Sequence, residues 1–315
     1  MKNVCIWAVA LSGLVACQQN EGLEDNVFDS SLKVVAEIAS NASSRTTTQR
    51  DGKVSFKEND KIGFYMPEAE TSGLWTYDGD VWNSSIHYQW KDKVNDYTFC
   101  AYYPFTEEAS RTQIPMPDLT KQNGTWEQIG MYDFLAARCT TNYSENKGVV
   151  SFTGDEAFKH QYALVSVTIK KDKEAEEVVL SNLKFEAPGL TTSHTYHFGT
   201  SGKEDGVTVN GEEVNVLEYK NLSDEVSMEG YNKVVVINPL MLEEPVNFSI
   251  QYARDGIKYN ASSTALGSEL KKGYFYNLTL RLKKAGLVVE GKTIEDWNVI
   301  PMQDVEVEEN PVEAN

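Results

Sequence analysis

Short runs of alternating apolar and polar residues dominate this sequence, and they restrict it to a fold built from β-strands. The clearest run, residues 274–283, places five apolar side chains on one face: Tyr274, Tyr276, Leu278, Leu280 and Leu282. A second run, residues 163–169, alternates in the same way. A period of two is the pattern of a strand, and no helical stripe persists over three turns. The sequence therefore predicts an all-β protein.

The β-like runs fall into two series that meet near residues 153–160. Each series holds about seven short, aromatic-rich runs separated by Gly, Pro and Asn turns, which is the strand number of a β-sandwich. We therefore expect two tandem β-sandwich domains, at residues 31–155 and 156–303. A polar, acidic tether at residues 17–30 precedes them, and an acidic tail follows at residues 304–315.

The N-terminus has the pattern of an export signal. An apolar run at residues 4–15 is too short for a membrane span, which needs roughly 20 residues. It closes on Leu14-Val15-Ala16-Cys17, which resembles a bacterial lipobox. In this interpretation signal peptidase II cuts between Ala16 and Cys17, and Cys17 carries a lipid anchor that includes palmitate. The alternative is an ordinary cysteine beside an ordinary signal peptide.

The chain is strongly acidic. It has 29 Lys and Arg against 47 Asp and Glu, for a formal net charge of −18. Loss of residues 1–16 removes only Lys2, which leaves 28 basic residues against 47 acidic ones and a net charge of −19. Nucleic acids and anionic membrane surfaces both require a basic contact area. The charge therefore excludes a nucleic-acid partner and fits a protein displayed at the cell surface.

Two cysteines remain in the mature chain besides Cys17, because Cys5 leaves with the signal peptide. Cys100 and Cys139 both lie in strand-like apolar runs. One interpretation is two buried, reduced side chains. The other is a disulfide, which an exported protein permits.

The sequence offers no strong motif for catalysis, cofactor binding or metal binding. His194 and His197 are three residues apart, and in a strand that spacing points them to opposite faces. No CxxC, HExxH, EF-hand or G-x-S-x-G pattern occurs. Glycosidases need two carboxylates at a fixed separation, and 47 acidic residues single out no pair. We expect no enzyme activity, no cofactor and no metal.

Aromatic residues gather between residues 64 and 126 and include Trp75, Trp82 and Trp90. Flat aromatic faces stack on sugar rings, so one hypothesis is a glycan-binding surface in the first domain. The other is that these side chains form the sandwich core, since Trp and Tyr favour strands and bury large areas.

A strand pattern at residues 31–39 runs directly into a polar tract that contains Arg45 and Arg50. Polar loops of this kind are preferred sites of proteolysis. A cut there would detach the strand and leave an unpaired groove. A strand from another chain could then fill the groove, as in donor-strand complementation.

Seven segments, in this order behind the lipobox, resemble fimbrillins of Bacteroidales type V pili, particularly the Mfa-like group. They are Ser44-Arg45-Thr46, Phe56-Lys57-Glu58-Asn59-Asp60-Lys61-Ile62-Gly63, Trp75-Thr76-Tyr77-Asp78-Gly79, Phe99-Cys100-Ala101-Tyr102-Tyr103-Pro104, Phe158-Lys159-His160-Gln161-Tyr162-Ala163, Tyr274-Phe275-Tyr276-Asn277-Leu278-Thr279-Leu280 and Ile294-Glu295-Asp296-Trp297. The resemblance covers most of the mature chain. It implies two transthyretin-like, Greek-key sandwiches that assemble by strand exchange.

The resemblance also implies roles for particular residues. An Arg-specific protease would remove the lipidated N-terminal strand by cutting at Arg45 or Arg50, and residues 298–307 would supply a donor strand. The hypothesis is a structural and adhesive subunit of a cell-surface pilus, exported as an outer-membrane lipoprotein. Its partners would be other fimbrillin subunits, in a homo- or heteropolymer, and a receptor on a host or bacterial surface. The alternative is a non-polymerising surface lipoprotein that binds glycan through the aromatic-rich first domain, with Trp75, Trp82 and Trp90 as candidate stacking residues.

Overall fold

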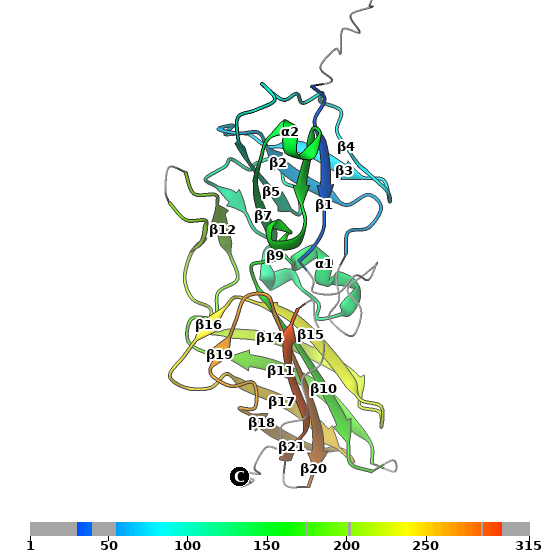
Figure 1. Cartoon of the computed structure of the whole chain (residues 1–315). Helices are drawn as coiled ribbons and strands as arrows, with labels where there is room; N and C mark the ends of the chain where they lie inside the picture. The colour runs from blue at the N-terminus through cyan, green and yellow to red at the C-terminus, as the bar shows by residue number, and fades with distance from the viewer. Residues whose placement is uncertain (1–29, 40–54, 174–175, 201–202, 285, 298–315) are drawn as a thin grey trace, which may run out of the picture.

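The structure is a computed structural model that describes residues 30–39, 55–173, 176–200, 203–284 and 286–297. Figure 1 shows an elongated molecule with an N-terminal sheet at one end and a C-terminal sandwich at the other. Residues 1–29, 40–54 and 298–315 lie outside the described part, and with them the predicted lipid site and both predicted cleavage sites. Within the described residues, no helix has the length and apolarity needed to span a membrane.

The elements of the N-terminal half are mostly short strands. They are β1 (Lys33–Ala36), β2 (Lys61–Tyr65), β3 (Gly73–Tyr77), β4 (Trp82–Asn83), β5 (Tyr97–Tyr103), β6 (Ile114–Pro115), η1 (Leu119–Lys121), η2 (Trp126–Gln128), α1 (Ile129–Tyr132), β7 (Leu135–Thr141), α2 (Tyr143–Asn146), β8 (Val149–Phe152), η3 (Gly154–Glu156) and β9 (Lys159–His160).

The C-terminal half consists of strands alone in its described part. They are β10 (Ala163–Lys171), β11 (Val178–Glu186), β12 (His194–His197), β13 (Gly206–Val209), β14 (Val216–Glu225), β15 (Tyr231–Ile237), β16 (Leu240–Met241), β17 (Asn247–Arg254), β18 (Ile257–Ser263), β19 (Glu269–Leu270), β20 (Tyr274–Lys283) and β21 (Gly286–Asp296). The prediction of an all-β fold is confirmed.

A six-stranded antiparallel sheet of order β4-β3-β2-β5-β7-β9 organises the N-terminal half. Its central strands bury both faces. In β5, Phe99 and Ala101 point to one face, and Cys100 and Tyr102 to the other. Because both sets are apolar, the sheet needs a covering layer on each side.

The first layer consists of β1 and β8, which pair parallel in a separate two-stranded sheet. Val34 and Ile38, from β1 and the residues after it, join Val150 and Phe152 of β8 in one core with the six-stranded sheet. This N-terminal core is rich in aromatic side chains. It includes Trp75, Trp82, Trp90 and Phe64.

The second layer comes largely from the C-terminal half. The sheet β13-β12-β6, together with η1 and α1, packs on the other face of the six-stranded sheet. Tyr196 and Phe198 contribute to this junction core alongside Tyr65 and Tyr102. In Figure 1 the β12 strand lies beside the N-terminal sheet, away from the strands of the C-terminal sandwich.

Two four-stranded sheets form the C-terminal sandwich, with orders β15-β10-β20-β21 and β14-β11-β17-β18. Their facing side chains, such as Val165, Leu183, Phe248 and Leu278, build a third core. The β10–β20 pair is parallel, whereas every other pair in the two sheets is antiparallel.

The predicted division of the chain at residues 155 and 156 stays a prediction, and two contacts bear on it. β9 pairs with β7 and so completes the N-terminal sheet. β12 pairs with β6 across the same boundary. The two halves therefore share the junction core and pair strands across the predicted boundary.

The two buried cysteines lie on opposite faces of the six-stranded sheet. Phe99 is the cross-strand partner of Cys139, and Arg138 is the partner of Cys100. Cys100 therefore faces the junction core and Cys139 the N-terminal core. Both are unpaired, because side chains on opposite faces cannot meet in a disulfide. The interpretation as two reduced, buried thiols is confirmed.

We expect neither thiol to react with a disulfide reagent in the folded protein. Burial raises the pKa of the Cys139 thiol to about 12 and also raises the pKa of Cys100, so the reactive thiolate is scarce at neutral pH. A variant with Cys5 and Cys17 replaced by serine should yield no titratable thiol when folded and two in denaturant. Finding none in denaturant without reductant would instead reveal a disulfide.

Candidate functional site

β1 is held as an extended strand along one side of the N-terminal core. It pairs parallel with β8 in the register Val34 to Val150 and Ala36 to Phe152. The alternation of residues 32–38 explains this placement. Positions 32, 34, 36 and 38 are all apolar, whereas positions 33, 35 and 37 include Lys33 and Glu37. The chain thus contributes its first described strand to a layer whose other member lies more than a hundred residues later.

The apolar face of this segment is buried and its other face is open. Leu32, Val34 and Ile38 are 7%, 5% and 7% exposed, whereas Val35 is 46% exposed. Burial of such side chains stabilises the strand by roughly 1.5–3 kcal/mol each relative to leaving them in water. Leu32 and Ile38 lie outside the bounds of β1 but belong to the same apolar face. We call residues 31–39 the N-terminal strand segment.

Backbone hydrogen bonds fix the segment at both ends. Near its start, Leu32 N–H donates to Tyr88 O at 3.0 Å, and Trp90 N–H donates to Ser30 O at 2.8 Å. Near its end, Ala39 N–H donates to Phe158 O at 2.7 Å. Removing the segment would therefore expose both an apolar surface and a row of carbonyl acceptors. We call this surface the β1 groove.

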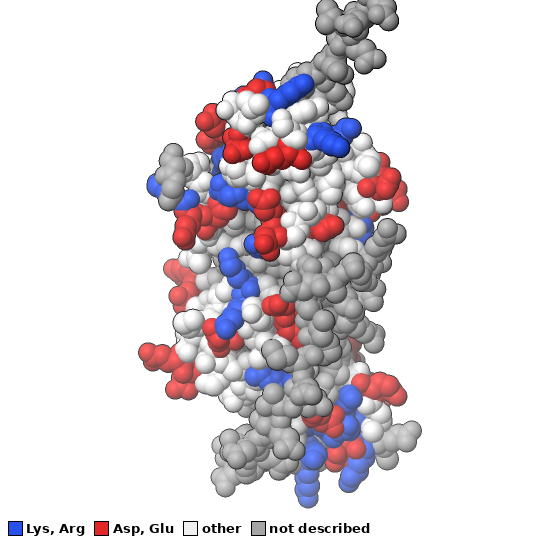
Figure 2. All heavy atoms as spheres, viewed as in Figure 1, with Lys and Arg blue, Asp and Glu red and all other residues white. Residues whose placement is uncertain are grey.

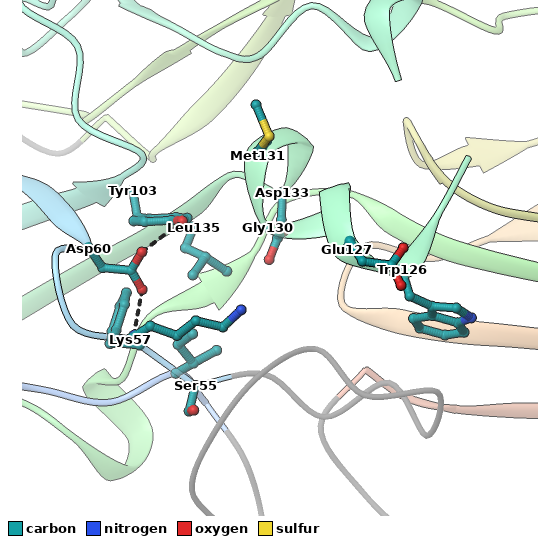
Figure 3. Close-up of a pocket in the computed structure, with 12 residues that line it drawn as sticks. Ser55, Lys57, Asp60, Tyr103, Trp126, Glu127, Gly130, Met131, Asp133 and Leu135 are labelled. Carbon is teal, nitrogen blue, oxygen red and sulfur yellow. Dashed lines mark hydrogen bonds between the residues drawn. The ribbon is translucent and has the colours of Figure 1, made fainter. Parts of the chain in front are cut away.

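A hollow of about 370 Å³ lies at the end of the β1 groove. Ile38 and Ser55, which lie on either side of the undescribed residues 40–54 in the sequence, both line it. The cleavage sites predicted at Arg45 and Arg50 fall inside that stretch. Figure 3 shows the side chains around the hollow, with Ser55 at one side.

The hollow carries charged groups without a catalytic arrangement. The Tyr103 hydroxyl and the Lys57 backbone N–H donate to the two oxygens of Asp60, at 3.3 and 2.6 Å (Figure 3). Burial raises the pKa of Asp60 above its usual value, although the Lys57 hydrogen bond offsets part of that rise. Asp60 is thus engaged in holding the 57–60 turn against β5. These contacts support the wall of the hollow and perform no evident chemistry.

The proposed glycan-stacking role of Trp75, Trp82 and Trp90 is wrong. The three side chains are 4%, 6% and 4% exposed, so their ring faces cannot reach a sugar. Trp75 stacks on Tyr88, and Trp90 packs against Phe99 with its Nε1–H donating to Gly148 O at 2.9 Å. The alternative interpretation, that they form the core, is the one observed. They build the wall against which the N-terminal strand segment packs.

The His194 and His197 pair also has a structural explanation. Both lie on β12, where residues three apart face opposite sides. The His194 ring nitrogens lie 2.9 Å from the Tyr162 hydroxyl and 2.7 Å from the Thr191 hydroxyl. Within the described ranges, no group of three or more His, Cys, Asp or Glu is placed to hold a metal ion.

One buried cluster at the junction was missed in the sequence. His160 Nδ1 lies 2.8 Å from Asp133 Oδ2, and both side chains are 1% exposed. The Trp297 indole stacks on the His160 ring at 4.0 Å, with the planes 8° apart. The backbone N–H of Trp297 donates to Gly273 O at 2.6 Å. The cluster therefore connects Trp297, at the end of β21, to His160 of β9 and to Asp133, the residue that follows α1.

The charges on the surface are mixed. The face drawn in Figure 2 shows acidic and basic side chains interspersed, without a continuous basic area among the described residues. This distribution agrees with a net charge of −18 and with the absence of a nucleic-acid footprint in the sequence.

Comparisons with known proteins identify a family through one family model and a shared fold through solved structures. A family model described as fimbrillin-like matches residues 44–297. A proposed cell adhesion protein from Bacteroides uniformis has a similar structure, with a TM-score of 0.56 and 17% identity over 85% of this chain and 98% of that chain. Another, from Bacteroides ovatus, has a TM-score of 0.54 and 16% identity over 86% and 98%. No curated protein shows a significant match.

We expect Val34→Asp to release the N-terminal strand segment and Val35→Asp to leave it in place. The first change puts a carboxylate into the aromatic core, which costs about 3 kcal/mol or more, whereas the second points into solvent. Hydrogen exchange of the amides of residues 33–37 measures the difference. Equal protection in the two variants would contradict the observed face assignment.

We expect His194 to make the fold sensitive to acid. Burial lowers its pKa from 6.5 to about 4, so the folded protein keeps the ring neutral where the unfolded chain protonates it. Stability is then lost as the pH falls from about 6.5 to about 4. In His194→Gln, the drop in unfolding free energy between about pH 7.5 and about pH 4.5 should be smaller by about 2–3 kcal/mol. Urea titrations at both pH values test this, and an unchanged drop would contradict it.

Proposed function

The chain belongs to the fimbrillin-like family, and we propose that it is a structural, non-enzymatic subunit of a cell-surface pilus that takes part in adhesion. In this proposal the subunit is exported as a lipoprotein and joins other fimbrillin subunits by strand exchange. The family match covers most of the chain, and the two similar structures share its fold.

The observation that carries the proposal is the way the N-terminal strand segment is seated. Its apolar face fills a groove in the N-terminal core, and its other face is open. Its covalent connection to the rest of the fold runs through residues 40–54, which contain Arg45 and Arg50. A single cut in that link would leave the segment attached by non-covalent contacts alone. Such a segment is replaceable by another strand of matching shape.

The lipid gives the precursor its location in this proposal. Cys17 follows the apolar run of the signal peptide and receives the anchor, which holds the chain at the outer membrane. The cut then separates the anchor from the sandwich, because Cys17 and the N-terminal strand segment lie on the same side of Arg45. An Arg-specific protease is thus the partner that converts a membrane-bound precursor into a subunit ready for assembly.

The glycan-binding alternative has lost its candidate stacking residues. Trp75, Trp82 and Trp90 are all buried. Adhesion through another surface stays part of the pilus proposal, with a receptor on a host or bacterial cell.

We expect an arginine-specific endoprotease to cut the folded precursor once, between residues 39 and 55. A palmitate analogue supplied to cells should label the precursor through Cys17, and after cutting and mild heating the label should leave with the small fragment. The larger fragment should stay folded, because the six-stranded sheet, β8 and the whole C-terminal sandwich lie beyond the cut and only β1 leaves. Gel electrophoresis and mass spectrometry of the fragments measure both outcomes.

Three variants serve as controls for this experiment. Cys17→Ser should take up no label. Arg45→Lys combined with Arg50→Lys should resist the protease, and the single variants identify the cut bond. Lys53→Gln, a nearby loss of charge, should be cut as the wild type is. Cutting of the double variant at the wild-type rate would overturn the assigned site, and unfolding of the larger fragment would overturn strand exchange.

A further inference from the structure

A second hollow, of about 300 Å³, lies between the β12–β13 hairpin and one end of the C-terminal sandwich. Besides the hairpin, its walls come from the residues just before β10, the link from β15 to β16 and the turn before β20. Pockets that bind small molecules begin at about this volume. We call it the hairpin hollow. It shares no described lining residue with the hollow at the end of the β1 groove.

Five polar side chains line the hairpin hollow although each is more than nine-tenths buried. They are Gln161, Tyr162, Thr191, His194 and Asn238. Hydrogen bonds fix their positions. The Thr191 backbone N–H donates to Asn238 Oδ1 at 3.0 Å, and the Gln161 side-chain amide donates to Lys159 O at 2.9 Å. Polar groups held in this way lose little conformational entropy when they bind a ligand.

The buried His194 ring leaves one hydroxyl hydrogen unused. Burial lowers the pKa of His194 to about 4, so at neutral pH the ring has one N–H and one lone pair. Its Nδ1 lies 2.9 Å from the Tyr162 hydroxyl, and its Nε2 lies 2.7 Å from the Thr191 hydroxyl. In either tautomer, one hydroxyl donates to the ring and the other accepts from it. The accepting hydroxyl keeps its hydrogen, and neither hydroxyl has a second partner among the described residues.

Lys272 gives the hairpin hollow a positive charge. Its Nζ donates to Gln161 Oε1 at 3.4 Å, which is a long hydrogen bond, and no carboxylate in the described part of the chain pairs with it. The neighbouring Lys271, by contrast, pairs with Glu269 at 3.2 Å. The described lining residues include no Asp or Glu, although the chain has 47 of them. The hollow is therefore a cationic site, rich in hydrogen-bond donors, in an acidic protein.

Another part of the wall is apolar and accessible. Val207 and Val209 are the cross-strand partners of Tyr196 and His194, so they lie on the face of the hairpin that lines the hollow. They are nevertheless 41% and 48% exposed. Pro239 adds a further apolar surface. Accessible apolar area inside a concave site favours a ligand with an apolar body.

From these features we propose that the hairpin hollow binds a small organic acid. Its carboxylate accepts hydrogen bonds from Lys272 and from the unused hydroxyl hydrogen, and its apolar body packs against Val207 and Val209. Hydrogen bonds between charged groups are stronger than neutral ones, so the carboxylate determines most of the selectivity. This site lies outside the β1 groove and does not depend on strand exchange.

Methyl NMR of the full chain with labelled valine methyl groups tests the proposal at neutral pH. The probes are cyclohexanecarboxylate, cyclohexanecarboxamide and acetate. The first two share an apolar body and differ in charge, whereas acetate has the charge without the body. Shifts of the Val207 and Val209 methyl signals show where each probe binds, and their dependence on probe concentration gives the affinity.

Two pairs of variants separate the charge of the hollow from the charge of the surface around it. Lys272→Gln removes the charge from the hollow, and Lys271→Gln removes one beside it. Val209→Asp adds a carboxylate to the hollow, and Thr208→Asp adds one on the opposite face of β13. All four positions are exposed, so each variant should keep the fold.

Cyclohexanecarboxylate should bind roughly tenfold or more tightly than its amide and than acetate. Lys272→Gln and Val209→Asp should each weaken its binding by about tenfold or more, and the two control variants should stay within about twofold of the wild type. Equal binding of acid and amide, or unchanged binding in Lys272→Gln, would overturn the proposal. So would the absence of any shift at the two valines. Strand exchange would be unaffected by these outcomes, because the chain in this experiment is uncut.

Discussion

The apolar character of both faces of the six-stranded sheet is the constraint on which the rest of the structure depends. In β5, Phe99 and Ala101 require cover on one side, and Cys100 and Tyr102 require it on the other. A bare face would expose these apolar side chains to water and lower the stability of the sheet. One cover is the β1–β8 layer, which is partly built from the start of the chain. The other comes mainly from β12 and its neighbours, so the C-terminal half is joined to the N-terminal half by a shared core.

This constraint explains why the first strand can matter so much for function. A cover that consists of a single end segment and one internal strand is complete only while the segment is present. The N-terminal strand segment supplies three buried side chains and a set of backbone N–H donors, all within the first described residues of the chain. The walls that hold it include Trp75 and Trp90. These side chains shape the groove. The glycan-binding hypothesis arose because the sequence shows how many aromatic residues this region has but not which of them are buried.

Local patterns were enough to predict the strands but not their surroundings. The alternation at residues 274–283 became β20, and that at residues 31–38 became the buried and open faces of the first strand. The burial of Trp90 could not be predicted from alternation. The neighbouring sheet is buried on both faces, so the sequence there does not alternate between apolar and polar residues. Contacts such as Asp133 to His160 and His160 to Trp297 depend on how distant elements meet. The periodicity of a single strand carries no information on contacts between residues this far apart in the sequence.

The stacked Trp297 has a mechanical consequence. Trp297 follows β21 directly, and its ring rests on His160 of β9, which in turn contacts Asp133, the residue that follows α1. A force applied at Trp297 therefore acts on a buried ring and, through it, on the hydrogen-bonded His160 and Asp133 pair, as well as on the hydrogen bonds of β21. The load is then shared between two places: the sheet that carries the β1 groove, through the stack on His160, and the start of β20, through the hydrogen bond from the Trp297 backbone N–H to Gly273 O.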